Sequence, residues 1–169
     1  TFVFRSAEEG KAFFEVAYGL REKHKGEKTG LIYSRINNPD LEILENRLCL
    51  WDEAEECAVF ESGMSAITTV LLEFLKPGDL LLTSLPLYGG TDHFINKILP
   101  KFGINVAVFH VGQSKGEIIK VVQDTGMADK LAMIYIETPA NPTNDLIDIK
   151  GSKEIARYFS TSGKDILLA

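Results

Sequence analysis

Cysteine is scarce in this chain, and its scarcity limits what the protein can be. The 169 residues include only two cysteines, Cys49 and Cys57, and their spacing matches no CxxC motif. A disulfide framework is therefore not indicated, and we expect free thiols in a reducing cytoplasm. Long apolar runs are missing as well, because no stretch reaches the roughly 18 consecutive apolar residues that predict a transmembrane helix.

An excess of basic residues is also missing. With 18 basic against 24 acidic residues the formal net charge is -6, and the basic side chains are scattered, which argues against a nucleic-acid surface. The glycine-rich motifs GxGxxG and GxxxxGKS/T are absent, so a generic nucleotide-binding α/β domain lacks its expected signals. His24, His93 and His110 have no ligand spacing with the cysteines or acids, and we expect no metal site.

What the chain does contain is an alternation of helical and strand-like segments. The first part favours a helix over 7–24 and a second helix after Asn38, with Pro39 at its first position. Leu41, Leu44 and Leu48 form the apolar face of that second helix. From residue 57 onward the expected strands cover 57–61, 80–84, 104–111, 131–137 and 165–169, and the expected helices cover 62–76, 89–102, 116–126 and 149–163. This order predicts an α/β fold with a mostly parallel sheet and helices on both faces, preceded by a helical and extended N-terminal arm.

Polar residues follow several of the expected strands, and ligands of open α/β sheets bind outside the carboxyl ends of the strands. Ser62 and Gly63 stand where a strand turns into a helix, and free amides at a helix N-terminus suit a phosphate. Tyr88 follows the next strand, where its ring can face a planar ligand and its hydroxyl can exchange a proton. The alternatives are ordinary: Ser62 as a helix N-cap, Gly63 as a packing glycine and Tyr88 as a core residue beside a turn.

The stretch YIETPANPT at 135–143 leaves a strand through a proline-rich loop. Prolines follow Thr138 and Asn141 and stiffen the loop, while the sequence leaves open whether either X-Pro bond is cis. Such a loop can hold Glu137 and Asn141 at a crevice, or it can simply turn the chain toward the next helix. Earlier in the chain, Tyr33 and Arg35 lie on an extended or loop segment, where an arginine either binds a phosphate or carboxylate or is merely solvated.

Taken in order, four motifs resemble those of the Cys/Met-metabolism family of pyridoxal-phosphate (PLP) enzymes: YSRINNP at 33–39, ESGMSA at 61–66, PLYGGT at 86–91 and ETPANPT at 137–143. The family includes cystathionine gamma-synthase, cystathionine lyases, methionine gamma-lyase and O-acylhomoserine sulfhydrylases. The resemblance is specific for the family and much less so for the reaction. It implies a fold-type-I PLP-dependent transferase-like fold, truncated at the C-terminal end, with an inter-subunit arm over 1–37 and an incomplete PLP-binding domain over 38–169.

The resemblance assigns expected roles in binding the cofactor phosphate, both within one subunit and from a neighbouring subunit. Ser62, Gly63 and Met64 match the family's phosphate cup, in agreement with the argument from the helix N-terminus. Tyr33 and Arg35 match the pair that reaches the cofactor phosphate of a neighbouring subunit, which implies a homodimer or homotetramer.

It also assigns roles around the pyridine ring. Tyr88 matches the aromatic residue that stacks on the ring, and it is the expected acid/base at the leaving group. Glu137 and Asn141 match residues at the ring edge, with the amide of Asn141 near the 3-oxygen. At the position of Gly90, methionine gamma-lyases typically carry a cysteine, so Gly90 favours a cystathionine-processing or sulfhydrylase member.

The implied activity is γ-elimination or γ-replacement on homoserine-type or sulfur amino acids, as in transsulfuration. Family members also carry an aspartate that pairs with the pyridine nitrogen and a Schiff-base lysine in a Ser-x-Thr-Lys context. The chain stops at Ala169 before such an aspartate, and none of its thirteen lysines has that context. We therefore expect a piece of a longer protein that is inactive by itself. The alternative is a non-catalytic fragment that serves in cofactor binding or assembly.

Overall fold

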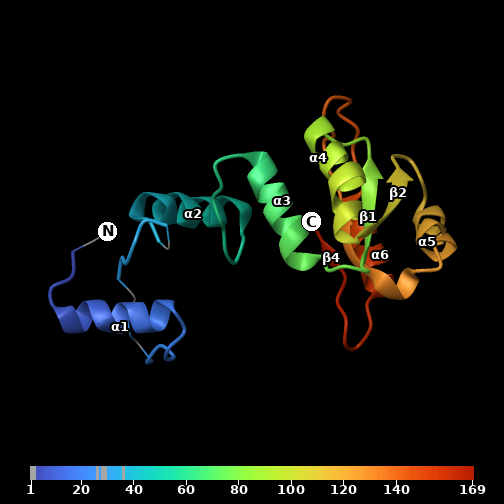
Figure 1. Ribbon diagram of the computed structural model, residues 1–169. Coiled ribbons are helices and arrows are strands. Elements are labelled where there is room, and N and C mark those ends of the chain that lie inside the picture. Colours follow the sequence, from blue (N-terminus) through green and yellow to red (C-terminus); the bar gives the residue numbers. More distant parts are fainter. Residues whose placement is uncertain (1–2, 26, 28–29, 36) are drawn as a thin grey trace. The chain divides into compact units, whose positions relative to one another are not determined.

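The computed structural model describes residues 3–25, 27, 30–35 and 37–169, and its contacts divide the chain into two units (Figure 1). The first unit is Thr1–Phe60 and the second is Glu61–Ala169. The sequence led us to begin the cofactor-binding domain at residue 38, whereas in the structure the second expected helix belongs to the first unit. The functional division into an arm and a domain stays a prediction.

The first unit opens with α1 (Ala7–Ala17), which is capped by Ser6, whose side chain accepts from the amide of Glu9 at 3.1 Å. The expectation of a helix as far as residue 24 is wrong. The helix ends before Gly19, whose φ of 66° leaves the right-handed region, and Arg21 then folds back to donate to the carbonyl of Ala12 at 3.3 Å. The guanidinium of Arg21 thus stabilises the return of the chain toward α1.

Arg21 also closes the following loop through Glu27. Its Nη1 and Nη2 donate to the two carboxylate oxygens at 2.9 Å and 2.6 Å. This bidentate hydrogen bond, together with a hydrogen bond from the backbone amide of His24, lowers the pKa of Glu27 to about 2. The carboxylate therefore remains charged across the physiological range.

The second helix, α2 (Pro39–Asp52), begins as expected, with the side chain of Asn38 accepting from the amide of Asp40 at 2.9 Å. None of its described residues is buried, so its apolar face does not form a core. The expected strand over 57–61 is wrong. The segment has no regular secondary structure, and the amide of Val59 donates to the side chain of Glu45 on α2 at 3.0 Å rather than to a neighbouring strand.

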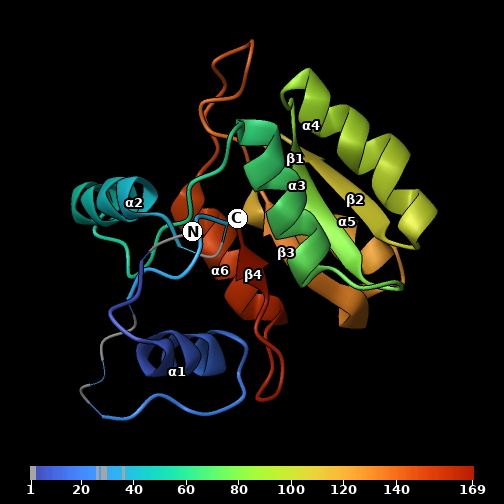
Figure 2. The same cartoon turned by 60° about the vertical axis from the view of Figure 1, so that its left-hand side comes forward.

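A parallel sheet organises the second unit, as the sequence predicts (Figure 2). Its strands lie in the order β2-β1-β3-β4, and each neighbouring pair is parallel. Their bounds are β1 (Leu80–Leu85), β2 (Asn105–His110), β3 (Leu131–Tyr135) and β4 (Leu167–Leu168). All of their carboxyl ends consequently lie at one edge of the sheet.

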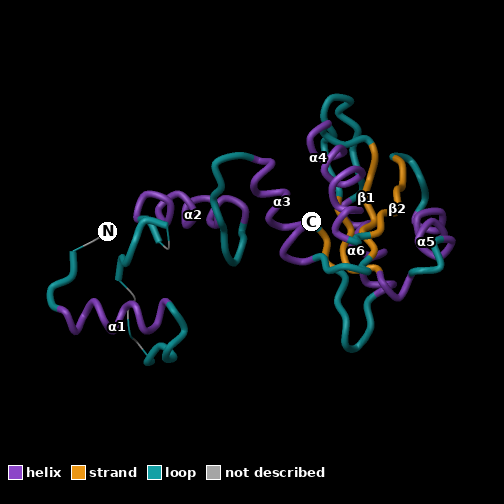
Figure 3. Tube along the Cα trace, viewed as in Figure 1, coloured by secondary structure: helices purple, strands orange, loops and turns teal. Residues whose placement is uncertain are grey.

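Helices connect these strands (Figure 3, purple). The α-helices are α3 (Gly63–Phe74), α4 (Gly89–His93), α5 (Lys115–Asp124) and α6 (Ile149–Phe159). A π-helical turn over Phe94–Ile98 and a 3₁₀ turn over Leu99–Phe102 extend α4, and a further 3₁₀ turn covers Ala128–Lys130. The expected helices after residue 61 are confirmed, with ends that differ by a few residues.

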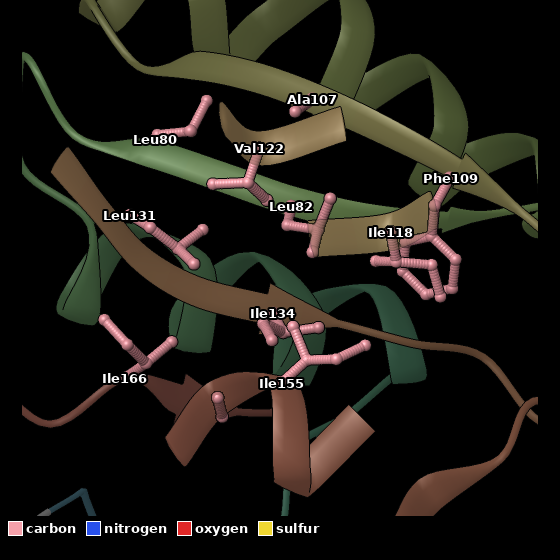
Figure 4. Close-up of a cluster of buried hydrophobic side chains, with 11 residues drawn as sticks. Leu80, Leu82, Ala107, Phe109, Ile118, Val122, Leu131, Ile134, Ile155 and Ile166 are labelled. Carbon is pink, nitrogen blue, oxygen red and sulfur yellow. The ribbon is translucent and has the colours of Figure 1, made fainter. Parts of the chain in front are cut away.

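The core consists of two apolar layers, one on each face of the sheet. On one face, Leu80 and Leu82 of β1 pack with side chains of α5 and α6, among them Val122 and Ile155 (Figure 4). On the other face, Leu81 packs with residues of α3 and of the helical run after Tyr88, including Leu71, Ile95 and Leu99. Each fully buried aliphatic side chain contributes about 1.5–3 kcal/mol. The expectation of helices on both faces is therefore confirmed.

The described part of the chain contains no helix that is both long enough and apolar enough to cross a membrane. The same residues include no cluster of three or more His, Cys, Asp or Glu side chains suited to a metal ion. Cys49 and Cys57 are free and half-buried. Burial, and to a lesser degree the neighbouring Cys57, raises the pKa of the Cys49 thiol, which is therefore protonated at neutral pH.

Candidate functional site

Two loops meet at the carboxyl edge of the sheet because β1 and β3 are adjacent and parallel. Tyr88 lies three residues after the end of β1, and Glu137 lies two residues after the end of β3. The loop after β3 runs beside α4 (Figures 1 and 2). The topology thus brings together polar residues that are far apart in the sequence.

The carboxylate of Glu137 joins the two loops. It accepts from the backbone amide of Tyr88, at 3.0 Å to Oε2 and 3.2 Å to Oε1, and from that of Asn141, at 2.8 Å to Oε1. The amide of Glu137 in turn donates to Oγ of Ser84, a fully buried residue of β1, at 3.3 Å. Both of the expected ring-edge residues and Tyr88 therefore lie in one hydrogen-bonded group.

The loop after β3 is closed by its own hydrogen bonds. Thr138 accepts from the amide of Ile147 at 3.0 Å, and the amide of Ala140 donates to the carbonyl of Asp145 at 2.9 Å. The peptide bonds before Pro139 and Pro142, which the sequence left open, are both cis, as is the bond between Leu85 and Pro86. Asn141, which lies in this loop, is exposed.

The three residues of the expected phosphate cup, Ser62, Gly63 and Met64, lie at the N-terminus of α3. Oγ of Ser62 accepts from the amide of Ser65 at 3.1 Å, so the N-cap interpretation of Ser62 is confirmed. The amides of Gly63 and Met64 come at the start of the helix, before any intrahelical acceptor is available to them. A side-chain carbon placed on Gly63 would meet no atom within 4 Å, so the space on that side of the glycine is open.

A carboxylate lies next to this cup. Oγ of Ser65 donates to Oε1 of Glu61 at 2.8 Å, and the hydroxyls of Ser62 and Ser65 are 2.7 Å apart. Hydrogen bonds from its own amide and from Ser65 lower the pKa of Glu61, so it is charged at neutral pH. Since Ser65 gives its proton to Glu61, the hydroxyl of Ser62 is the donor between the two serines.

Met64 and Gly90 connect the cup to Tyr88. A side-chain carbon on Gly90 would lie 2.8 Å from Cε1 of Tyr88 and 3.0 Å from Sδ of Met64, so both side chains pack over the bare glycine. Thr91, which is fully buried, has its hydroxyl 3.8 Å from the same sulfur. A series of contacts in the second unit therefore connects the cup, the tyrosine ring and the loop after β3.

Tyr135 is the last residue of β3, and its phenol interacts with Thr91. Burial raises the pKa of its phenol, the charge of Glu137 adds to the effect, and a hydrogen bond with Thr91 opposes it. The phenol is therefore neutral at physiological pH. Tyr135 is a supporting residue, whereas Tyr88 is 46% exposed and accessible to a ligand.

Tyr33 and Arg35 lie in the first unit, on a turn that Asn37 stabilises. The side chain of Asn37 accepts from the amide of Ile32 at 2.9 Å and donates to the carbonyl of Gly30 at 3.1 Å. The guanidinium carbon of Arg35 lies 5.6 Å from the centroid of the Tyr33 ring, and both side chains are exposed. The two residues therefore lie next to each other, and the side chain of Arg35 is exposed.

Sequence reasoning missed Ser84, Thr91 and Glu61 as parts of the site. A usable signal existed for Ser84, since a hydroxyl at the end of the apolar run LLLTS is unusual unless it has a partner. Thr91 and Glu61 stood inside quoted motifs, but only the packing reveals what they contact. Together, the anion cup, the exposed ring of Tyr88 and the exposed amide of Asn141 suit a ligand that carries a phosphate and a flat polar ring.

Comparison with known proteins agrees with this chemistry. The family model described as Cys/Met metabolism PLP-dependent enzyme matches residues 1–162. L-methionine gamma-lyase of Fusobacterium nucleatum is 35% identical over 156 residues, which are 92% of this chain and 35% of that protein. Cystathionine gamma-lyase of Rattus norvegicus is 29% identical over 153 residues, 90% of this chain and 36% of that protein.

A solved structure supports the fold. The putative O-acetylhomoserine (thiol)-lyase of Campylobacter jejuni, solved with N'-pyridoxyl-lysine-5'-monophosphate, matches with a TM-score of 0.75 and 24% identity, over 94% of this chain and 35% of that one. The second unit is thus a part of a fold-type-I arrangement, as the motifs implied. The chain spans about a third of the length of the relatives it matches.

Proposed function

The chain belongs to the Cys/Met-metabolism family of PLP-dependent enzymes, and on that premise we propose that it supplies the N-terminal part of an enzyme acting on sulfur-containing or homoserine-type amino acids. The proposed reaction is γ-elimination or γ-replacement. The observation that carries the proposal is the series of contacts that joins the α3 cup, Tyr88 and the loop after β3. In keeping with its two free thiols, we place the enzyme in the cytoplasm.

The proposed phosphate site is the start of α3. The amides of Gly63 and Met64 and the hydroxyl of Ser62 would hold the cofactor phosphate, aided by the positive end of the helix dipole. The residues present fit this group, because the amides are free of intrahelical acceptors and the space beside Gly63 is open. To donate to the phosphate, Ser62 has to turn its proton away from Ser65.

The proposed ring site lies between Tyr88 and the loop after β3. The ring of Tyr88, supported by Gly90 and Met64, would stack on the pyridine ring. Asn141 would donate from its amide near the ring oxygen, and Glu137 completes the site at the ring edge. When bound, pyridoxal phosphate supplies the electron sink for chemistry at the amino-acid carbons.

Tyr88 is also the residue we propose for proton transfer. Its phenol is half-exposed at the carboxyl edge of the sheet, where it can give a proton to, or take one from, the leaving γ-substituent. In the full-length protein, Tyr88→Phe is expected to lower kcat by about 10²–10⁴-fold while the ring still stacks on the cofactor. Unchanged turnover in this variant would remove Tyr88 from the role.

A pair of substitutions at Ser62 tests the phosphate site. Ser62→Ala removes the cap and one phosphate donor, whereas Ser62→Asp keeps the cap but adds a negative charge that repels phosphate. Titration of the full-length apoprotein with pyridoxal phosphate, followed by absorbance, is expected to give weaker binding for Ser62→Asp than for Ser62→Ala. Binding of wild-type affinity by Ser62→Asp would contradict the assignment.

We further propose that the 169-residue chain alone does not turn over substrate. None of its thirteen lysines lies in the Ser-x-Thr-Lys context of the family's Schiff-base lysine. A non-catalytic cofactor-binding or assembly role is the alternative for the chain by itself. Borohydride treatment in the presence of pyridoxal phosphate separates the cases: covalent labelling is expected in the full-length protein, and labelling of this chain would contradict the claim.

The proposed partner is a second copy of the protein. Tyr33 and Arg35 would reach the cofactor phosphate of the neighbouring subunit in a homodimer or homotetramer. The exposed apolar side chains of α2 support association, since Trp51 is 72% exposed and Ile43 is 67% exposed. Mixing inactive Arg35→Ala and Ser62→Asp subunits should restore part of the activity if the residues act across an interface, and no recovery is expected if they act within one subunit.

Two observations favour different reactions for the full-length enzyme. Gly90 favours a cystathionine-processing or sulfhydrylase enzyme, while the relatives with about 35% identity are named methionine gamma-lyases. Assays of the full-length protein with methionine, cystathionine and O-acetylhomoserine plus a thiol would decide. Release of methanethiol as the fastest reaction would contradict the expectation drawn from Gly90.

A further inference from the structure

We propose that Glu137 is a positioning residue, whose carboxylate fixes the loop after β1 to the loop after β3 and acts on the ligand site through Tyr88 and Asn141. The inference rests on the proposed function in one respect: that function makes the ring of Tyr88 and the amide of Asn141 the groups that Glu137 positions for a ligand. The tie itself, by which we mean the hydrogen bonds from the amides of Tyr88 and Asn141 to the carboxylate of Glu137, forms in the protein without any ligand.

The geometry of the tie involves both carboxylate oxygens of Glu137. Oε2 accepts from the amide of Tyr88 at 3.0 Å, and Oε1 accepts from the amide of Asn141 at 2.8 Å and from that of Tyr88 at 3.2 Å. The backbone of Glu137 is itself fixed to β1 through Oγ of the buried Ser84. One side chain therefore connects two loops, and the residues Tyr88 and Glu137 that it joins are 49 positions apart in the sequence.

The ionised form of the side chain suits this role. A carboxylate only accepts hydrogen bonds, and each of its oxygens faces an amide donor here. Tyr88 is also the N-cap residue of α4, so the negative charge lies at the positive end of a helical run that continues to Phe102. A glutamine would keep one accepting oxygen and would place an NH₂ group against a backbone N–H.

The consequence concerns the two side chains that meet the ligand. The held amides belong to the same residues, Tyr88 and Asn141, whose side chains form the proposed ring site. Fixing their backbones sets the separation between the stacking ring and the polar amide before any ligand arrives. Both carboxylate oxygens are engaged by these two amides, so Glu137 acts on the ring site through the residues it holds.

Hydrogen exchange of the full-length apoprotein tests the tie directly. In Glu137→Gln and Glu137→Ala, the amides of Tyr88 and Asn141 are expected to exchange at least about tenfold faster, the effect of losing a hydrogen bond to a charged group. Glu117→Gln is the matched control, because Glu117 likewise accepts from a backbone amide, that of Ser114, at 2.7 Å. The control should accelerate exchange only around Ser114. Unchanged exchange at Tyr88 and Asn141 in both Glu137 variants would overturn the proposal.

Cofactor binding supplies the second readout. If Glu137 positions the two loops, its variants should bind pyridoxal phosphate more weakly and give a smaller visible circular dichroism signal, while Glu117→Gln matches wild type. Faster exchange with unchanged binding and dichroism would overturn the positioning role. Should the wild-type protein bind no pyridoxal phosphate at all, the proposed function fails, yet the exchange result still decides whether the tie exists.

Discussion

Gly90→Ala is the change whose effect on the site follows most directly from the geometry. The added carbon would lie 2.8 Å from Cε1 of Tyr88 and 3.0 Å from Sδ of Met64. Nonbonded carbon atoms prefer a separation of about 3.5–4.0 Å, so the tyrosine ring has to move by about 1 Å. A displacement of about 1 Å in a positioned group can cost about 10²-fold in rate. We therefore expect kcat/KM of the full-length protein to fall by about that factor.

The adjacent glycine provides a matched control. A side-chain carbon on Gly89 would meet no atom within 4 Å, although both glycines lie in the first turn of α4. Both alanine variants share the gain in helix propensity of about 1 kcal/mol, so a difference between them reports the contact with Tyr88. The assay is steady-state kinetics with pyridoxal-phosphate titration of each variant. Equal kcat/KM for Gly89→Ala and Gly90→Ala would refute the reasoning.

The remaining predictions concern charge and packing. Glu61→Gln removes the negative charge beside the α3 cup, so pyridoxal phosphate should bind about two- to fivefold more tightly in a titration, and weaker binding would contradict the expected repulsion. The pKa of Glu27 is lowered from 4.5 to about 2 by Arg21, so its stabilising effect is complete above pH 4.5 and is lost as the pH falls toward 2. In thermal unfolding, Glu27→Gln should therefore lose less stability than wild type over that range, and identical pH profiles would count against the pair. Leu82→Ala empties a fully buried position and should lower the free energy of unfolding by about 2–5 kcal/mol in urea titrations, whereas a loss below about 1 kcal/mol would argue against the packed layer.

The second unit was predictable because its local patterns agree with its packing. Apolar runs such as 80–84 are buried on both faces of the sheet, and helices like α5 carry a clear N-terminal signal, the capping box of Ser114 and Glu117. The first unit was less predictable. The helix over 7–24 ends early because Arg21 finds partners across a turn, and the apolar run at 57–61 pairs with a side chain of α2 instead of a strand. Local periodicity carries no information about such partners.

The site was predictable in its positions and less so in its contacts. Tyr88, Glu137 and Asn141 were identified from their places after strands and from their motifs, and Ser62 from its motif and its place at a helix N-terminus, since the strand expected before it does not form; the structure gathers all four in the second unit. That the carboxylate of Glu137 accepts from two backbone amides required the three-dimensional pairing of β1 with β3. A motif indicates which residues lie near each other, but it does not indicate which of their atoms already form hydrogen bonds within the protein.

The central claim is that the start of α3 holds the phosphate of pyridoxal phosphate while Tyr88 faces its ring. A crystal structure of the full-length protein with pyridoxal phosphate tests this most directly. We predict the phosphate within hydrogen-bonding distance of the amides of Gly63 and Met64, with the ring between Tyr88 and the side of the loop that carries Asn141. A phosphate bound elsewhere on the protein, with the start of α3 empty, would contradict the account.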